Sequence, residues 1–231
     1  MNLFYSSRIE GNSAYLTDEE HRHCSKVLRY KKGDQICCTN GMGIKYQTHI
    51  HQINKKDTEL HIDIEHVIPK PHYNIHLGIA MPKRSNRLDF LIEKLVEIGI
   101  QDISPLITAH SERRKINTGR YRKKIISAST QSLKYHFPVL HEQTTFKAFL
   151  ESQAKQHILV AHYAEENSSI SLAAANQKSI TVLIGPEGDF SPTELAKIQE
   201  LGIEQVNLSK HRLRTETAAI VACTLLNETF F

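Results

Sequence analysis

The sequence predicts a two-domain α/β protein, with a small β-barrel at residues 1–70 and a mostly parallel α/β domain at residues 71–231. Three observations predict this organisation. Apolar and polar residues alternate in the first part, as at 44–50, which is typical of antiparallel strands with one wet face. The prolines of Pro69-Lys70-Pro71 favour an extended linker. Beyond them, strand and helix patterns alternate as in βαβ units.

Length and composition exclude several classes of protein. A chain of 231 residues can bury its cores without disulfides, and its four cysteines form no Cys-x-x-Cys pair, so we expect reduced thiols. The 14 histidines lack acidic or cysteine partners at zinc-like spacing, so we expect no metal. No apolar run is long enough to span a bilayer, and the N-terminus lacks the apolar segment of a signal peptide. We therefore expect a soluble, cytoplasmic protein.

Turn-forming residues divide the first domain into short strands. They lie at Lys32–Asp34, Asn40–Gly43 and Asn54–Asp57. Thr17, with Glu20 three residues later, predicts the capped start of a short helix. That helix would carry Arg22, Lys26 and Arg29. A small barrel with a basic helix is a common way to hold RNA, although a merely solvated helix explains this pattern equally well.

The second domain is expected to begin with a strand, a helix and a strand. Ile75–Ala80 reads as the first strand, Met81–Arg87 as a basic loop and Ile100–Ile107 as the next strand. Between them, Leu88 to Val96 has apolar residues at helical spacing, and Gly99 stands where a helix would end. Parallel strands joined in this way have a right-handed connection.

A strongly basic segment follows, from His110 to Tyr135. Its eight basic residues face one acid, Glu112, and they are Arg113, Arg114, Lys115, Arg120, Arg122, Lys123, Lys124 and Lys134. Such a run is usually a solvated face, but its one-sidedness in a nearly neutral protein favours contact with ribose-phosphate. A helix is expected from Ile125 to Leu133, with Pro138 blocking its continuation. Further on, we expect a helix at 146–154, a strand at 157–162 and a short helix at 171–175.

Two strand-loop-helix units end the chain, and the chemistry is expected in their loops. Ile180–Ile184 reads as a buried strand that runs into the loop 185–190. Ser191 fits the N-cap of the next helix, with Pro192 at the first helical position and Glu194 completing a capping box. The second unit has a strand at 205–208, a loop at 209–214 and a helix from 215. In open parallel sheets, ligands bind where such loops leave the carboxyl ends of the strands.

Common catalytic motifs are missing from the sequence. There is no Gly-x-x-x-x-Gly-Lys-Ser/Thr, no Gly-x-Gly-x-x-Gly after a strand and no Gly-x-Ser-x-Gly. These absences argue against a nucleoside triphosphatase, a dinucleotide enzyme and a hydrolase with a nucleophile elbow. What remains is a glycine-containing loop with Glu187 beside a loop that carries Arg212, Arg214 and Glu216.

These two loops carry a resemblance to a known family. Ile184-Gly185-Pro186-Glu187-Gly188-Asp189-Phe190-Ser191 and Leu208-Ser209-x-x-Arg212-Leu213-Arg214-Thr215-Glu216-Thr217-Ala218 resemble the paired C-terminal motifs of the SPOUT methyltransferases. Within them, the chain is similar to the ribosomal RNA small subunit methyltransferase E family, which methylates uridine at N3 in small-subunit RNA. The match covers essentially the whole chain, through His23-x-x-x-Val27-Leu28-Arg29, Lys83–Arg87, Glu97-Ile98-Gly99 and Gln131-Ser132 with Pro138.

The resemblance implies a fold, a cofactor and a partner. The fold would be an N-terminal PUA-like β-barrel followed by a SPOUT α/β domain whose end threads into a trefoil knot. The cofactor would be S-adenosyl-L-methionine, bound in a bent form inside the knot. The substrate would be small-subunit (16S) ribosomal RNA or the assembled subunit, and the protein would be a homodimer with its active site near the subunit interface.

The resemblance also implies roles for particular residues. Arg214 would stabilise the charge that develops on the uridine carbonyls, and Glu216 would act as base or orienting group, unless it merely favours the helix dipole. Glu187 would orient the cofactor or hold its loop closed, and Thr215 and Thr217 would be caps or ligands. The cofactor contacts would be Ile184, Gly185, Pro186, Glu187, Gly188, Leu208, Arg212, Leu213, Thr215 and Ala218. The RNA contacts would be Arg8, Arg22, Lys26, Arg29, Lys83, Arg84, Arg87, Arg113, Arg114 and Lys134.

The chain departs from the family pattern at three positions. Thr130 and Lys134 stand where an acid and an arginine are usual, so a bidentate arginine contact becomes a point charge. Asp189 replaces a common second glycine. Two alternatives stay open: another SPOUT RNA methyltransferase, acting on a ribose 2′-hydroxyl or a different base, and an RNA-binding assembly factor without catalysis.

Overall fold

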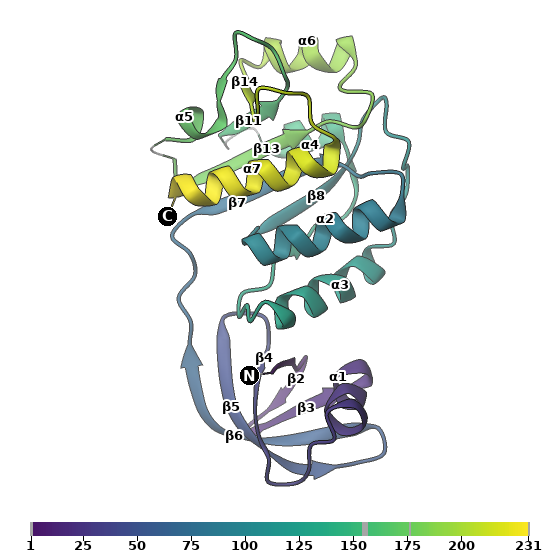
Figure 1. Cartoon of the computed structure of the whole chain (residues 1–231), viewed down its shortest axis with the longest axis vertical. Helices are drawn as coiled ribbons and strands as arrows, with labels where there is room; N and C mark the ends of the chain where they lie inside the picture. The colour runs from purple at the N-terminus through teal and green to yellow at the C-terminus, as the bar shows by residue number, and fades with distance from the viewer. Residues whose placement is uncertain (1, 154–156, 176, 231) are drawn as a thin grey trace. The chain divides into compact units, whose positions relative to one another are not determined.

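Figure 1 shows the computed structural model of the protein, which describes residues 2–153, 157–175 and 177–230. The chain forms two compact units. The first comprises residues up to Lys70 together with Ile126–Phe137, and the second comprises Pro71–Ile125 and the rest of the chain from Pro138.

The first unit is built on a curled six-stranded sheet with the order β1-β4-β5-β6-β3-β2. The strands are β1 (Leu3–Tyr5), β2 (Arg8–Glu10), β3 (Ser13–Thr17), β4 (Gln35–Thr39), β5 (Ile44–Ile53) and β6 (Asp57–Val67). The long strands β5 and β6 bend visibly in Figure 1, and their register shifts at two irregularities. Because bulges bend strands and increase their twist, they explain the curl. In the described residues β1 and β2 remain edges, so the sheet is a half-barrel.

One detail of this sheet differs from the expectation of antiparallel strands. β1 pairs with β4 in parallel, whereas the other pairs are antiparallel. Inward-facing side chains from both edges and the centre form one core, which includes Phe4, Leu16, Ile50 and Leu60. The predicted alternation therefore identified the buried face correctly, and it could not specify the direction of an edge strand.

The short basic helix lies between β3 and β4, but its predicted cap is wrong. It comprises α1 (Asp18–Arg22) and a π-helical turn η1 (His23–Val27). Thr17 occupies the N-cap position, yet its side chain makes no capping hydrogen bond. Glu20 instead accepts a hydrogen bond from the backbone N–H of Tyr5, 3.2 Å away, so the carboxylate serves strand β1 rather than the helix start. Arg29 lies beyond the helix, at a φ of 58°.

Residues 126–137 complete the first unit. The N–H of Gly43 donates to the carbonyl of Tyr135 (2.8 Å), and the His136 ring lies within hydrogen-bonding distance of the Ile68 carbonyl (2.7 Å). The rings of Tyr5 and Phe137 are 5.4 Å apart. A segment distant in sequence from the half-barrel is thus attached to it by backbone hydrogen bonds and aromatic contact.

The second unit is an eight-stranded sheet whose pairs are parallel. Its main path runs β10-β8-β7-β13-β11-β14-β12, with β9 also paired to β8. The strands are β7 (Asn74–Ala80), β8 (Asp102–Ile107), β9 (Val139–Leu140), β10 (Thr144–Thr145), β11 (Ile158–Ala161), β12 (Ser168–Ser169), β13 (Ser179–Ile184) and β14 (Glu204–Asn207). The order places β13 between β7 and β11, so segments far apart in sequence meet at the centre of the sheet.

The helices in this part of the chain are α2 (Ser85–Ile98), α3 (Thr118–Gln131), α4 (Phe146–Ser152), α5 (Ile170–Ala174), α6 (Pro192–Glu200) and α7 (Thr215–Phe230), and α3 is shared between the two units. α2 buries the five apolar residues that its spacing predicted and ends at Gly99, whose φ is 117°. Figure 1 shows α2 and α7 on the same face of the sheet, and they pack against each other. The predicted end of α4 at Ala154 lies outside the described residues.

The described residues contain no group of three or more His, Cys, Asp or Glu side chains that could hold a metal ion. All four cysteines are buried, and Cys24, Cys37 and Cys38 are free thiols. Among the described helices, none has the length and apolar character needed to cross a membrane.

Candidate functional site

A pocket of about 420 Å³ lies at the carboxyl ends of β11, β13 and β14, where the two C-terminal loops meet. It is lined by Ala161, His162, Tyr163, Ile184, Gly185, Pro186, Glu187, Asp189, Val206, Leu208, Ser209, His211, Arg212, Leu213, Arg214, Thr215 and Ala218. Nine of the ten predicted cofactor contacts are in this set, and Gly188 is the exception. Arg214 lines the pocket as well, whereas Glu216 does not.

The first loop is fixed by the predicted capping box. The Ser191 hydroxyl accepts from the Glu194 N–H (3.3 Å), and the Glu194 carboxylate accepts from the Ser191 N–H (2.8 Å). The second oxygen of Glu194 accepts from the N–H of Ala109 (2.9 Å), in the segment that follows β8. One carboxylate therefore closes the loop and ties it to a neighbouring strand end.

Gly188 does not line the pocket but contacts His110. The ring of His110 lies 3.1 Å from the Gly188 carbonyl and 3.0 Å from that of Asp189. A Cβ at position 188 would lie 3.3 Å from the Cβ of His110, which is closer than most such contacts. Glycine at this position allows the loop to approach His110 closely.

The backbone conformation and contacts of Asp189 explain why an aspartate can stand where the family often has a glycine. Its φ is 61°, in the left-handed region that glycine adopts freely and that aspartate tolerates better than most residues. One carboxylate oxygen accepts from the N–H of Phe190 (2.7 Å), and the other lies 3.2 Å from Nδ1 of His162. The aspartate thus keeps the glycine conformation and adds a polar contact inside the pocket.

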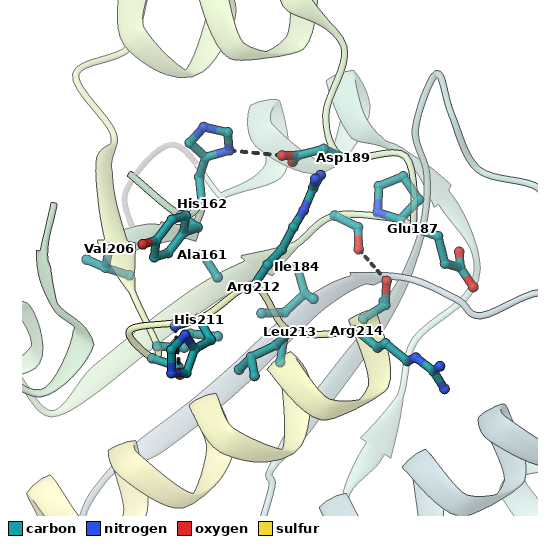
Figure 2. Close-up of a pocket in the computed structure, with 17 residues that line it drawn as sticks. Ala161, His162, Ile184, Glu187, Asp189, Val206, His211, Arg212, Leu213 and Arg214 are labelled. Atoms are coloured by element: carbon teal, nitrogen blue, oxygen red, sulfur yellow. Dashed lines mark hydrogen bonds and ion pairs between the residues drawn. The ribbon is translucent and has the colours of Figure 1, made fainter. Parts of the chain in front are cut away.

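The second loop is joined to the first by a hydrogen bond. The Thr215 hydroxyl donates to the carbonyl of Gly185 (3.1 Å), which is drawn as a dashed line in Figure 2. Arg212 and Arg214 are both exposed. Figure 2 shows Arg212 extending toward the Asp189 end of the pocket, whereas Arg214 points away from that end. The two side chains therefore lie at different parts of the pocket.

Glu216 is placed differently from Arg214, although both belong to one motif. Only 8% of Glu216 is exposed, in the first turn of α7. One of its carboxylate oxygens, Oε1, lies 3.4 Å from Nε of Arg87 on α2. The other, Oε2, is buried and has no hydrogen-bond partner among the described residues.

The predicted RNA contacts are divided between the two units, five in each. In the first unit they are Arg8, Arg22, Lys26, Arg29 and Lys134. Arg8, Arg22, Lys26 and Arg29 are exposed, and the Arg8 guanidinium also stacks over the Tyr15 ring, 3.5 Å from its centroid. In the second unit they are Lys83, Arg84, Arg87, Arg113 and Arg114.

The basic segment is less one-sided in space than in sequence. Its ion pairs within the second unit are Arg120–Asp89 (2.6 Å), Arg122–Glu142 (2.6 Å) and Lys124–Glu93 (2.5 Å). Lys83 pairs with Glu112 (2.6 Å), and this hydrogen bond raises the pKa of Lys83. Arg113 donates to the carbonyls of Pro82 and Lys83 and to the Ser85 hydroxyl. Acids from other segments therefore pair with three of the eight basic residues that favoured nucleic acid.

Sequence reasoning missed seven pocket residues. They are Ala161, His162, Tyr163, Asp189, Val206, Ser209 and His211. The strand before His162 was predicted, but nothing local indicates that it lies between β13 and β14. Only the sheet order, which depends on long-range pairing, brings its carboxyl end to the site.

Comparison with known proteins identifies the family. A family model of an RNA methyltransferase domain matches residues 69–227, and one of an RNA methyltransferase PUA domain matches residues 16–63. The chain is 29% identical to the ribosomal RNA small subunit methyltransferase E of Rickettsia conorii over 225 residues, covering 95% of this chain and 92% of that protein.

Two solved structures resemble the whole chain. A probable rRNA-methyltransferase from Porphyromonas gingivalis has a TM-score of 0.90 and 34% identity, covering 99% of this chain and 98% of that one. A ribosomal RNA small subunit methyltransferase E from Neisseria gonorrhoeae, bound to S-adenosyl methionine, has a TM-score of 0.81 and 26% identity, covering 96% and 95%. Because the domain family matches residues 69–227 and the relatives align over nearly their whole length, the chain belongs to the RNA methyltransferase family, with an RNA methyltransferase PUA domain at its N-terminal end.

Proposed function

We propose that this protein transfers a methyl group from S-adenosyl-L-methionine to N3 of a uridine in small-subunit (16S) ribosomal RNA. The observation that carries the proposal is the pocket formed by both C-terminal loops, which gathers nine of the ten expected cofactor contacts. The relative from Neisseria gonorrhoeae, bound to S-adenosyl methionine, supports the cofactor. The uridine and its N3 atom rest on the sequence resemblance to the methyltransferase E family.

The residues present fit this cofactor. About 420 Å³ lies within the range of small-molecule sites, which is about 300 to 1,000 Å³. Ile184, Leu213 and Ala218 offer apolar surface to an adenine ring. The carboxylates of Glu187 and Asp189 place negative charge at the pocket of a cationic sulfonium. S-adenosyl-L-methionine, when bound, supplies an electrophilic methyl group.

The reaction then requires a group that accepts one proton and a group that stabilises one developing negative charge. Uridine N3 loses its proton as it is methylated, and the negative charge spreads onto the two base carbonyls. Arg214, exposed at the pocket, is suited to stabilise that charge. Glu216 carries the carboxylate of the same motif and is our candidate acceptor for the proton.

The proposal also assigns a separate function to each of the two domains. Residues 1–70 act as a PUA-like RNA-binding domain, and residues 71–231 as the SPOUT methyltransferase domain with a C-terminal trefoil knot. The exposed residues Arg22, Lys26 and Arg29 support RNA contact by the first domain. A homodimer and a cytoplasmic location follow from the same resemblance, and light scattering of the purified protein tests the dimer.

Methyl transfer tests the proposal against the binding-factor alternative. The protein is incubated with labelled S-adenosyl-L-methionine and either small ribosomal subunits or their RNA. We expect label in the RNA of one of these substrates. Cofactor binding by calorimetry without transfer to any small-subunit substrate would favour an RNA-binding assembly factor instead.

Arg214→Ala tests the assignment of the charge-stabilising group. We expect kcat to fall by about two to three orders of magnitude, as when a donor to a developing oxyanion is removed. The affinity for S-adenosyl-L-methionine should change little. Single-turnover transfer and calorimetric titration measure the two quantities, and a variant with wild-type kcat contradicts the assignment.

A further inference from the structure

Glu216 is a buried carboxylate with one ion-paired oxygen. Oε1 lies 3.4 Å from Nε of Arg87, and the side chain is 10% exposed. Oε2 has no hydrogen-bond partner among the described residues. A carboxylate oxygen removed from water is unfavourable unless a donor reaches it, so this atom requires a donor that the described part of the chain does not supply.

Arg87 is turned toward this carboxylate rather than toward solvent. Its side chain is 25% exposed, whereas Lys83 and Arg84, in the loop just before α2, are exposed. A residue that contacts RNA phosphates has to present its guanidinium on the surface. Arg87 therefore differs from its basic neighbours, although the sequence groups them together.

The pair also connects two elements of the site. Arg87 lies in the first turn of α2, just after the loop that leaves β7, and Glu216 lies in the first turn of α7. That turn follows Arg214 and includes Thr215, both of which line the pocket. A guanidinium and the positive end of the helix dipole both face the carboxylate. This arrangement suits a negative charge held in one orientation beside the pocket.

We propose that Arg87 is a positioning residue that holds Glu216 as the acceptor of the uridine N3 proton, and that it does not bind RNA phosphate. This inference rests on the proposed function. The N3–H bond breaks and its proton moves to Oε2 of Glu216. The N3–C bond forms as the methyl leaves sulfur, and the electron pair of the broken S–C bond remains on the sulfur of the neutral thioether product. The proton is released to water before the next turnover.

A double-mutant cycle tests the proposal. Arg87→Gln, Glu216→Gln and the double variant are compared for kcat and for the KM of RNA. Because the two residues act as one unit, each single variant should lower kcat at least about tenfold, and the double variant should be no worse than Glu216→Gln. The KM of RNA should stay within about twofold of wild type in Arg87→Gln. Arg87→Lys, which keeps a positive charge, should recover part of the lost kcat.

Two control variants separate the effect of the Arg87–Glu216 pair on kcat from the effect of removing any positive charge. Lys197→Gln removes an exposed ion pair, with Glu200 on α6, and should leave kcat unchanged. Arg84→Gln removes an exposed charge from the loop just before α2, three residues from Arg87, and should raise the KM of RNA. Calorimetric titration with S-adenosyl-L-methionine checks that each variant retains a folded pocket, independently of turnover.

Three results would overturn the proposal. Multiplicative losses in the double variant would mean that the two residues act separately. A raised KM of RNA with normal kcat in Arg87→Gln would make Arg87 an RNA contact. Normal kcat in Glu216→Gln would remove the proton acceptor. A wild-type protein that binds the cofactor but transfers no methyl group would instead contradict the proposed function itself.

Discussion

His76 is a buried titratable side chain on strand β7, away from the residues that line the pocket. Its ring lies 2.8 Å from the Ser104 hydroxyl and is only 8% exposed. The rings of His141 and Phe149 are 5.2 Å and 5.4 Å away. The pKa of His76 is lowered to about 4, chiefly by burial; Asp102 opposes this shift and His141 adds to it. The folded protein therefore holds this histidine neutral.

The depressed pKa of His76 predicts acid sensitivity. In the unfolded chain this histidine binds a proton near its ordinary pKa of 6.5, whereas in the folded chain it binds one only near 4. Its contribution to stability is therefore complete above about pH 6.5 and falls as the pH decreases toward 4. Between pH 7 and pH 4.5 we expect His76 to account for about 2 kcal/mol of the loss.

Urea unfolding of the wild type and of His76→Gln, at both pH values, measures this contribution. Glutamine can keep a hydrogen bond to Ser104 but does not titrate. The variant should lose about 2 kcal/mol less than wild type over the same interval. An equal loss in the two proteins would show that His76 is not the titrating group.

At the residue scale, the sequence predicted what local chemistry determines. Ser191, Pro192 and Glu194 specify a capping box through their spacing alone, and the structure contains it. Asp189 could be noticed only as a departure from glycine. Its contact with His162 depends on which strand lies beside β13, and no local pattern contains that information.

At the element scale, the neighbours of the basic segment reduce the unpaired positive charge that its sequence indicates. Counting charges between His110 and Tyr135 favours RNA, yet Asp89 and Glu93 on α2 and Glu142 neutralise three of those charges. Pairs like these, each with at least one exposed partner, contribute at most about 1 kcal/mol each. Their consequence is a weaker local field than the sequence suggests.

Arg113 has a structural task within this segment. Its guanidinium donates hydrogen bonds to the carbonyls of Pro82 and Lys83 and the hydroxyl of Ser85, which fixes the loop before α2. Arg113→Ala should lower the free energy of unfolding by about 2 kcal/mol, because hydrogen bonds to a charged group are among the stronger ones. Arg122→Ala, which loses only an exposed pair with Glu142, should cost less than about 1 kcal/mol. Thermal unfolding compares the two variants, and equal losses would contradict the structural role of Arg113.

The ends of the helices show one success and one failure of prediction from the local sequence. Gly99 ends α2 as expected, because the left-handed conformation there suits glycine. The cap predicted at Thr17 fails, since Glu20 is engaged by the edge strand β1. A tertiary hydrogen bond thus replaces a local one, which sequence spacing cannot anticipate.

At the scale of the whole molecule, long-range pairing determines what the sequence could not. The alternation of strand and helix patterns predicts a parallel sheet, and the sheet is parallel. Its order, with β13 between β7 and β11, brings three carboxyl ends together and creates the pocket. The attachment of residues 126–137 to the first unit is equally non-local.

The identity of the methylated nucleoside decides whether the proposed reaction is correct. Small-subunit RNA that has received labelled methyl groups from this protein is digested to nucleosides and analysed by mass spectrometry against standards. We expect the label in N3-methyluridine. Label in a 2′-O-methylated ribose or in a different base would contradict the proposed reaction.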